Sequence, residues 1–280
     1  MDKTFKVACV QNCATDDMEA NISATEALVR AAASAGASLI CLPEYFCILE
    51  RSDWAYFDKG FEADQHPALT HFRNLAKELH SWLLLGSIPV KFKARKVHNR
   101  SHLIAPDGKL VAIYNKLHLF DVAIKDGQNY RESLSVAPGD RAVIADLPWG
   151  RLGLTICYDV RFPHLYRALA KAGAHFIAVP AAFTAKTGEA HWHTLVRARA
   201  IENACYIFAP DQPGQRPWGR RTYGHSLIVD PWGAVLADGG EDEGYIVADI
   251  DPARVEEARR MIPALTHDRD IQHATFEKRK

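Results

Sequence analysis

Short apolar runs alternate with amphipathic stretches along the first third of the chain. The apolar runs at residues 5–11, 38–42 and 82–88 have the length of buried strands. Between them, residues 18–36 and 67–80 repeat their apolar positions with helical spacing, which predicts two helices. This β-α-β-α-β order predicts an α/β protein in which helices cover a sheet.

The pattern changes beyond residue 100. A turn signal at 106–109 joins strands predicted at 100–105 and 110–115, and a long polar segment, 116–140, follows them. The alternation of strands and helices then resumes. We expect strands at 153–156, 175–179, 205–209, 223–229, 234–238 and 245–250, helices at 162–172 and 189–203, and a last helix opened by Pro252.

The chain shows no linker, repeat or low-complexity segment, so we expect a single domain over residues 1–280, with a charged tail from about residue 259. Hydrophobic residues make up 48% of the sequence, and Lys plus Arg balance Asp plus Glu at 34 each. A formal net charge of zero argues against nucleic-acid binding, which depends on neutralising phosphates. We therefore expect a small-molecule partner, with no nucleic acid and no membrane involved.

The six cysteines indicate a reducing compartment. They form no CxxC pair, and the chain is too long for a disulfide scaffold. No signal peptide is visible at the N-terminus, and the most apolar stretch, 82–90, is too short to span a bilayer. These features predict a cytoplasmic protein with free thiols.

Cys157 stands at a predicted corner between a strand and a helix. It follows the apolar run 153–156, and Pro163 is suited to open a helix shortly afterwards. At such a corner a thiol can point into a cleft while backbone N–H groups face an oxyanion. The position alone is also compatible with a small packing residue, which is what most buried cysteines are. We take the other five as packing residues: Cys9, Cys13, Cys41, Cys47 and Cys205.

Two charged residues occupy matching positions at the ends of other predicted strands. Glu44 follows the run 38–42 among apolar and aromatic neighbours, and Lys116 follows the strand 110–115. Residues just past the carboxyl ends of strands in an α/β sheet converge on one crevice. Each residue has a plain alternative as a surface charge, but three functional groups at three strand ends predict that Glu44, Lys116 and Cys157 meet.

These residues lie in stretches that resemble the motifs of a known family. The stretches 42–44, 114–121 and 156–163 are similar to the three motifs of the nitrilase, or carbon–nitrogen hydrolase, superfamily. The resemblance extends from about residue 5 to residue 270. It implies a four-layer α-β-β-α sandwich and assembly into a homodimer or a larger homo-oligomer.

The resemblance also implies the role of each residue. Cys157 would attack an amide carbonyl and form a thioester, with Glu44 as general base. Lys116 would stabilise the oxyanion together with a corner N–H such as that of Tyr158. Glu132 matches a second glutamate of the family pattern and would orient Lys116 and the substrate amide. We expect an amidase that needs no cofactor and no metal.

Within the superfamily the chain is most similar to the Nit branch. The stretches that carry this similarity are 187–192, 197–202 and 223–233. The branch includes deaminated glutathione amidases and ω-amidases that act on α-ketoglutaramate, and residues 197–202 with Asp230 favour the former. Other amides, nitriles and N-carbamoyl amines remain open as substrates.

Arginines are the candidates for binding a substrate carboxylate, because a guanidinium can form a bidentate pair with it. Arg161, four residues after Cys157, is the first candidate, and an ion pair with Asp159 is its structural alternative. The loop 211–221 could reach the distal carboxylates of a longer substrate, although a solvated basic loop is the plainer interpretation. Its side chains of interest are Arg216, Trp218, Arg220 and Arg221.

Three other classes of protein are alternatives to this amidase. A metal hydrolase would use His191 and His193, but residues two apart on a helix do not share a face, and no HExxH motif is present. A Cys–His hydrolase would use His118 or His164, neither of which lies in a papain-type or caspase-type signature. A non-catalytic scaffold is the third rival, because a fold by itself does not prove activity.

Overall fold

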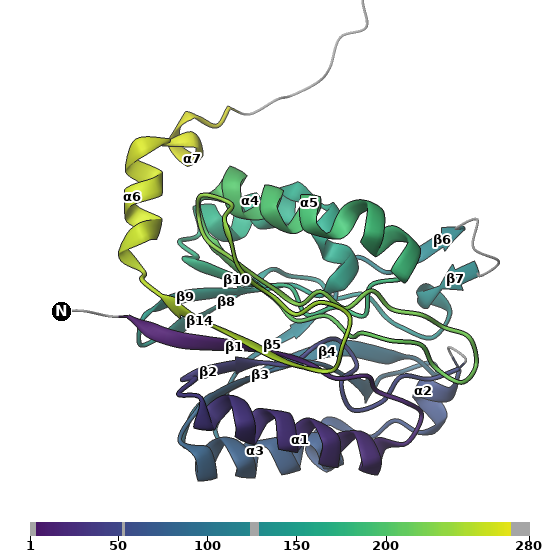
Figure 1. The fold of residues 1–280 in the computed structure, drawn as a ribbon. Helices are drawn as coiled ribbons and strands as arrows, with labels where there is room; N and C mark the ends of the chain where they lie inside the picture. The colour runs from purple at the N-terminus through teal and green to yellow at the C-terminus, as the bar shows by residue number, and fades with distance from the viewer. Residues whose placement is uncertain (1–3, 52–53, 124–128, 270–280) are drawn as a thin grey trace, which may run out of the picture.

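The fold consists of four layers (Figure 1). The computed structural model describes residues 4–51, 54–123 and 129–269. Two six-stranded sheets face each other in the middle of the molecule. The outer layers are helices α1 (Met18–Ser34) and α3 (Pro67–Leu79) on one side and α4 (Pro163–Lys171) and α5 (Ala185–Asn203) on the other. The expected four-layer α-β-β-α sandwich is therefore confirmed.

The first sheet has the strand order β14-β1-β2-β3-β4-β5. Its strands are β1 (Phe5–Gln11), β2 (Leu39–Cys41), β3 (Trp82–Lys91), β4 (Val97–Ile104), β5 (Leu110–Asn115) and β14 (Gly244–Ile250). β1, β2 and β3 run parallel, whereas β14 pairs antiparallel with β1, and β3, β4 and β5 form an antiparallel meander. The turn predicted at 106–109 joins β4 to β5.

The second sheet repeats this pattern of strand directions. Its order is β8-β9-β10-β11-β12-β13. Its strands are β8 (Val143–Leu147), β9 (Gly150–Leu154), β10 (Phe176–Ala178), β11 (Tyr206–Ala209), β12 (Leu227–Val229) and β13 (Val235–Asp238). β9, β10 and β11 run parallel, and the other neighbours are antiparallel. Each sheet therefore has a parallel centre whose carboxyl ends can carry a site.

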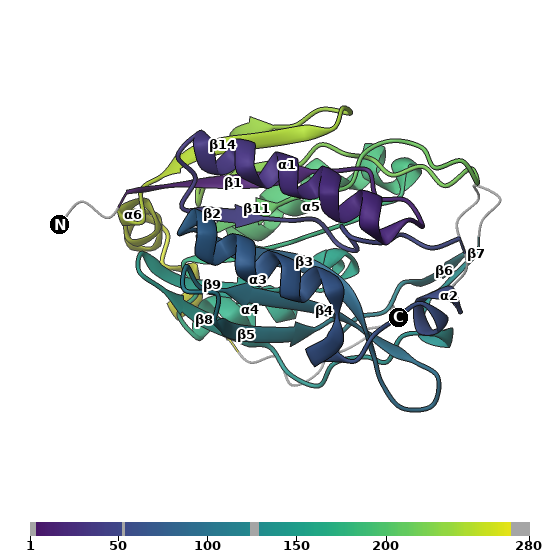
Figure 2. The same cartoon turned by 90° about the horizontal axis from the view of Figure 1, so that it is seen from below.

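Alternate residues of the central strands face different layers. In β1, Val7 and Cys9 belong to the core between the two sheets, whereas Ala8 and Val10 pack in the core under α1 and α3. Seen from below, α1 and α3 lie side by side over the first sheet (Figure 2). Burial on both faces explains why the sequence shows continuous apolar runs here rather than alternation.

Local signals in the sequence place the helix starts. Asp17 caps α1, where its side chain accepts a hydrogen bond of 3.1 Å from the backbone N–H of Ala20. Pro67 and Pro163 are the first residues of α3 and α4, a position in which the missing N–H costs nothing. The helix expected after the Cys157 corner therefore begins at the predicted proline.

Two strand predictions differ from the structure. The strand expected at 223–229 is shortened to Leu227–Val229, because Gly224 and His225 have φ angles of 73° and 52°, which a strand does not allow. The strand Val143–Leu147 was not predicted, although residues 142–145 form a short apolar run; it is half-exposed and lies at a sheet edge.

Several segments extend or subdivide the expected elements. α5 begins at Ala185 instead of 189, and α6 (Ala253–Met261) and α7 (Ala264–His267) continue past the expected start of the tail at 259. The end of that tail lies outside the described residues. The smaller elements are α2 (Ala55–Asp58), β6 (Asp121–Ala123) paired with β7 (Asn129–Arg131), and 3-10 helices at Ala63–Gln65, Glu132–Leu134 and Cys157–Arg161.

Candidate active site

Glu44 lies three residues after β2 in a buried loop and is only 3% exposed. Its carboxylate accepts hydrogen bonds of 2.8 Å from Asn99 Nδ2, 2.8 Å from Lys116 Nζ and 3.0 Å from the backbone N–H of Ala182. Burial alone raises the pKa of Glu44, but the charge of Lys116 and the hydrogen bonds to the carboxylate outweigh it and hold the pKa below its ordinary value. Glu44 is therefore a carboxylate at neutral pH.

Lys116 follows β5 directly and is 2% exposed. Its backbone N–H continues the strand pairing to the carbonyl of Asn99, at 2.9 Å, which fixes the start of the side chain. Its ammonium lies 2.8 Å from Glu44 Oε1 and 3.0 Å from Glu132 Oε2. Burial disfavours the charged amine, but the two carboxylates reverse that effect and raise the pKa of Lys116 well above its ordinary value. The lysine is a fixed cation.

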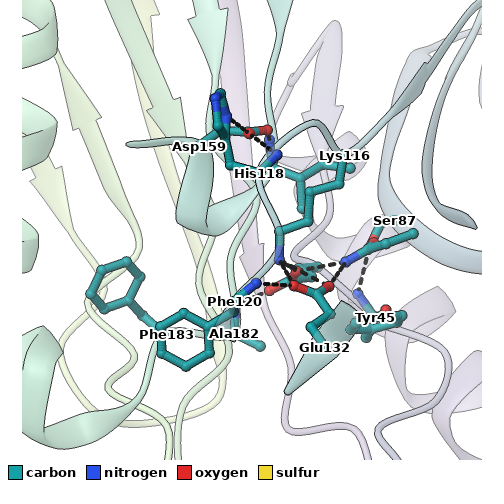
Figure 3. A network of polar contacts seen from close by, with 12 residues as sticks. Tyr45, Ser87, Lys116, His118, Phe120, Glu132, Asp159, Ala182 and Phe183 are labelled. Carbon is teal, nitrogen blue, oxygen red and sulfur yellow. Dashed lines mark hydrogen bonds and ion pairs between the residues drawn. The ribbon is translucent and has the colours of Figure 1, made fainter. Parts of the chain in front are cut away.

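Glu132 is the second carboxylate that pairs with the Lys116 ammonium, in addition to Glu44 (Figure 3). It begins the 3-10 helix after β7, and its carboxylate accepts hydrogen bonds from the backbone N–H of Phe120 at 2.7 Å and from Asn99 Nδ2 at 3.1 Å. Burial raises the pKa of Glu132, and the negative charge of Glu44 adds to this, so that the pKa stays above its ordinary value despite Lys116. The ammonium of Lys116 thus forms ion pairs with two carboxylates.

Cys157 forms the predicted corner after β9. Its φ angle is 49°, a left-handed conformation that non-glycine residues rarely adopt, and its N–H donates to the carbonyl of Pro180 at 2.8 Å. The side chain is 7% exposed, and its thiol lies close enough to the Glu44 carboxylate for the two groups to shift each other's pKa. Burial, together with the charge of Glu44, raises the pKa of the Cys157 thiol well above its ordinary value. In the resting site the cysteine is a thiol, with a base beside it.

The fully buried Asp159 ties two motifs together and was not recognised from the sequence. It accepts hydrogen bonds from Tyr114 Oη at 2.6 Å and from the backbone N–H of Ile156 at 2.9 Å, and it lies 2.7 Å from His118 Nδ1. Tyr114 lies in β5, two residues before Lys116, and Ile156 directly precedes Cys157. Asp159 therefore holds the lysine segment against the cysteine corner.

Asn99 is a second positioning residue that sequence reasoning missed. It lies on β4 and is fully buried, and its amide donates to both Glu44 and Glu132. A signal was present: residues 98–102 read His-Asn-Arg-Ser-His, an unusual polar run inside a strand between apolar neighbours. Polar residues buried in a strand need partners, so such a run points to a site.

The converging groups line one cavity. All of the predicted catalytic residues line it, namely Glu44, Lys116, Glu132 and Cys157, and so does Tyr158. Arg161 does not line it. Aromatic side chains supply much of the remaining wall, which favours a compact ligand with apolar parts as well as polar groups.

Arg161 lies behind two of these aromatic walls. Its guanidinium carbon is 5.3 Å from the ring centroid of Phe183 and 6.0 Å from that of Tyr158, and Nη2 lies 3.3 Å from His191 Nδ1. The ion pair with Asp159, its structural alternative, is not formed. Among the basic residues of the loop 211–221, Arg220 does line the cavity.

The histidines that a Cys–His hydrolase or a metal hydrolase would use do not line the cavity. His118 pairs with Asp159 and stacks on Phe162 at 3.6 Å, so its contacts give no support to a Cys–His pair. His193 and His225 each lie 2.9 Å from a carboxylate oxygen of Asp238, and these three residues form the one group in the described ranges that could hold a metal ion. None of these residues lines the cavity.

A thiol beside a carboxylate and an ammonium is the set of groups that nucleophilic hydrolysis of a carbonyl compound requires. The chain belongs to the carbon–nitrogen hydrolase family, which it matches over residues 6–260. It is 41% identical to the deaminated glutathione amidase of Synechocystis sp. over 271 residues, covering 95% of this chain and 98% of that protein.

Two further relatives show the same similarity. The omega-amidase NIT2 of Bos taurus is 35% identical, with 95% of each chain covered. The crystal structure of the Caenorhabditis elegans NitFhit protein superposes with a TM-score of 0.88 at 38% identity, covering 95% of this chain and 65% of that longer one. The predicted resemblance is thus confirmed, and the protein is a carbon–nitrogen hydrolase of the amidase type.

Within the residues described, no helix combines the length and the apolar character that crossing a bilayer requires.

Proposed function

We propose that this amidase hydrolyses a small amide that carries a carboxylate, of the deaminated glutathione type, and releases the acid and an amine or ammonia through a thioester on Cys157. The observation that carries the proposal is the convergence of Cys157, Glu44 and Lys116 in one cavity. The identity to a deaminated glutathione amidase over almost the whole chain supports the choice of substrate.

In the first step the sulfur of Cys157 attacks the amide carbonyl carbon while Glu44 accepts the thiol proton. The pKa shifts set the starting states, a protonated Cys157 thiol beside an ionised Glu44 carboxylate, so the proton moves to Glu44 only as the sulfur attacks the carbonyl carbon. Lys116, with the backbone N–H of Tyr158, stabilises the oxyanion. Glu44 then returns the proton to the departing nitrogen, the carbon–nitrogen bond breaks, and a thioester remains.

In the second step a water molecule attacks the thioester, and Glu44 takes its proton. The tetrahedral intermediate collapses, the carbon–sulfur bond breaks, and the sulfur recovers a proton from Glu44. Glu132 acts by holding Lys116, to which it is bound at 3.0 Å, and by facing the substrate amide from the cavity wall. Glu44 thus serves as base and acid in both halves of the reaction.

Arg161 is proposed to attract the substrate carboxylate. Its half-buried guanidinium packs over the rings of Phe183 and Tyr158, and both of these residues line the cavity. A charge at this distance from the cavity favours an anionic substrate even without a direct hydrogen bond.

An ω-amidase acting on α-ketoglutaramate is the second candidate, favoured by the 35% identity to omega-amidase NIT2. Both candidates share the acyl-transfer chemistry and differ in the leaving group, a longer amine or ammonia. A non-catalytic scaffold is disfavoured because the complete set of reactive groups is present.

The proposed setting is the cytoplasm, where the protein would form a homodimer or larger homo-oligomer, with neither nucleic acid nor membrane as a partner. The free state of all six cysteines is in keeping with a reducing compartment. Exposed apolar side chains beside α5 and α6, among them Ile201, Trp232, Met261 and Ile262, offer a surface for self-association that sedimentation measurements can test.

The proposal is tested by the release of amine or ammonia over a panel of keto-acid amides, neutral amides, nitriles and ureido acids. We expect keto-acid amides to be the best substrates and Cys157→Ala to lower kcat by about 10⁴-fold or more. Its melting temperature should stay near that of the wild type, because the charged network does not depend on the thiol.

The matched control is Cys13→Ala, which removes a half-buried thiol outside the cavity and should leave kcat unchanged. Turnover retained by Cys157→Ala would overturn the thioester mechanism.

A further inference from the structure

The three arginines of the loop 211–221 have different environments. Arg216 is 2% exposed and donates hydrogen bonds to the carbonyls of Ala14 at 3.1 Å and Pro213 at 2.8 Å, and also to the side chain of Gln212. Gln212 in turn donates to the backbone carbonyl of Glu44 at 2.7 Å. Arg216 is a structural residue that fixes this loop against the catalytic base.

Arg221 faces away from the site. It is exposed and lies 3.0 Å from a carboxylate oxygen of Glu241, with which it forms a surface ion pair. Such a pair contributes little to stability and leaves the cavity untouched.

Arg220 differs from both neighbours because it lines the cavity. No acidic side chain of the described ranges forms an ion pair with it, and its Nε atom is buried without a hydrogen-bond partner there. Its guanidinium carbon lies 6.0 Å from the ring centroid of Tyr130, another residue of the wall. The backbone around it is fixed, since the carbonyl of Arg220 accepts a 2.8 Å hydrogen bond from the N–H of Arg216.

The two carboxylates of the cavity wall form ion pairs with Lys116 and not with Arg220. Lys116 lies between Glu44 and Glu132, and these three groups satisfy one another. Together they carry one net negative charge, which repels an anionic substrate. Tyr45 also lines the cavity, and its buried hydroxyl has no hydrogen-bond partner in the described residues.

We infer that Arg220 is the residue that binds a carboxylate of the substrate inside the cavity, with the Tyr45 hydroxyl able to donate to the same group. A guanidinium without a protein partner in a half-buried wall is suited to a bidentate pair with a carboxylate. The inference rests on the proposed function and makes it more specific: Arg220 sets the preference for anionic over neutral amides.

Arg131 also lines the cavity, but it is exposed to solvent at the rim, where an ion pair is screened. Arg161 does not reach the wall. Both therefore serve as comparison variants, and Arg221→Gln is the matched control from the same loop.

The test measures binding and turnover separately. Calorimetry on Cys157→Ala protein compares a five-carbon keto dicarboxylate with its monomethyl ester, before and after Arg220→Gln or Arg220→Lys. We expect Arg220→Gln to weaken binding of the dicarboxylate by roughly 10- to 100-fold and to leave the ester nearly unchanged. Arg220→Lys should restore part of the affinity, and Arg221→Gln should have no effect.

With the Cys157 thiol present, Arg220→Gln should raise KM for a keto dicarboxylate monoamide while leaving kcat/KM for its methyl ester within about twofold. Equal losses on both substrates, or loss of discrimination in Arg161→Gln or Arg131→Gln instead, would overturn the inference. Melting temperatures identify a variant that is merely misfolded, and Arg220→Lys then carries the test. If the protein cleaves no amide but Cys157→Ala still binds the dicarboxylate through Arg220, the proposed function fails and this inference stands.

Discussion

The two sheets have the same order of strand directions but contribute different parts of the site. The first sheet supplies the charged groups: Glu44 follows β2, Asn99 lies on β4 and Lys116 follows β5. The second sheet supplies Cys157, after β9, and the backbone N–H of Ala182, which follows β10. In the proposed mechanism the same architecture therefore carries a charged half and a nucleophilic half, and the reaction depends on how the two meet.

The charged half is satisfied within itself. Each carboxylate has an ammonium and an amide donor, so the network persists whether or not the thiol is present. The nucleophilic half is joined to it through the fully buried Asp159, which accepts hydrogen bonds from Tyr114 Oη and from the backbone N–H of His118. This difference predicts that substitutions in the charged half lower the stability of the protein. Substitutions at the contact between the halves should mainly lower the rate of the reaction.

The largest effect is expected from removing the shared cation. Lys116→Met leaves Glu44 and Glu132 buried without a counter-charge. We expect kcat/KM to fall by about 10³-fold or more and the free energy of unfolding at pH 7 to fall by roughly 3 kcal/mol. Enzyme assays and urea denaturation measure both quantities. The control is Lys109→Met, which removes an exposed lysine paired with Asp107. A stable, active Lys116→Met enzyme would contradict the claim that Glu44 and Glu132 depend on Lys116 for their counter-charge.

The next effect concerns the second carboxylate. Glu132→Gln should lower kcat/KM by about 10²-fold, because Lys116 loses one of its two anchors. It should also move the acid limb of the pH–rate profile to lower pH. In the wild type, falling pH first protonates the member of the pair with the raised pKa, Glu132. In the variant only Glu44 titrates, and Lys116 holds its pKa below the ordinary value.

The measurement is kcat/KM as a function of pH for both enzymes, with an exposed carboxylate, Asp146→Asn, as the control. An acid limb that stays in place or moves to higher pH would show that Glu132 does not govern it.

A smaller effect is expected at the contact between the halves. Asp159→Asn keeps the shape of the side chain but weakens its short hydrogen bond to Tyr114 and its pairing with His118. We expect kcat/KM to fall by roughly 10-fold through misplacement of Cys157 relative to Lys116. Tyr114→Phe should have a weaker effect in the same direction. Thiol alkylation rates, which would change with the position of the sulfur, distinguish misplacement from lost stability. Unchanged kinetics in Asp159→Asn would contradict a positioning role.

The sequence predicted the central elements well and the edges less well. Continuous apolar runs such as 5–11 and 38–42 could only be buried strands or short helices, and prolines 67 and 163 marked helix starts. The half-exposed edge strand Val143–Leu147 was missed, because its apolar run of four residues is short and lies next to the long polar segment 116–140. The strand prediction at 223–229 was wrong in its first half, because Gly224 and His225 adopt a left-handed backbone conformation that interrupts the strand.

The sequence by itself determined the chemistry: a thiol, a carboxylate and an ammonium, each just past a strand, and the family motifs that contain them. Only the tertiary structure decided which partners those groups have. Asn99 and Asp159 became positioning residues because burial forces a polar side chain to find partners wherever the fold brings them, however distant in the chain. The tertiary structure likewise distinguished three arginines of one polar loop. Arg216 is buried, Arg220 lines the cavity and Arg221 is exposed, and only their packing in the folded chain makes this difference.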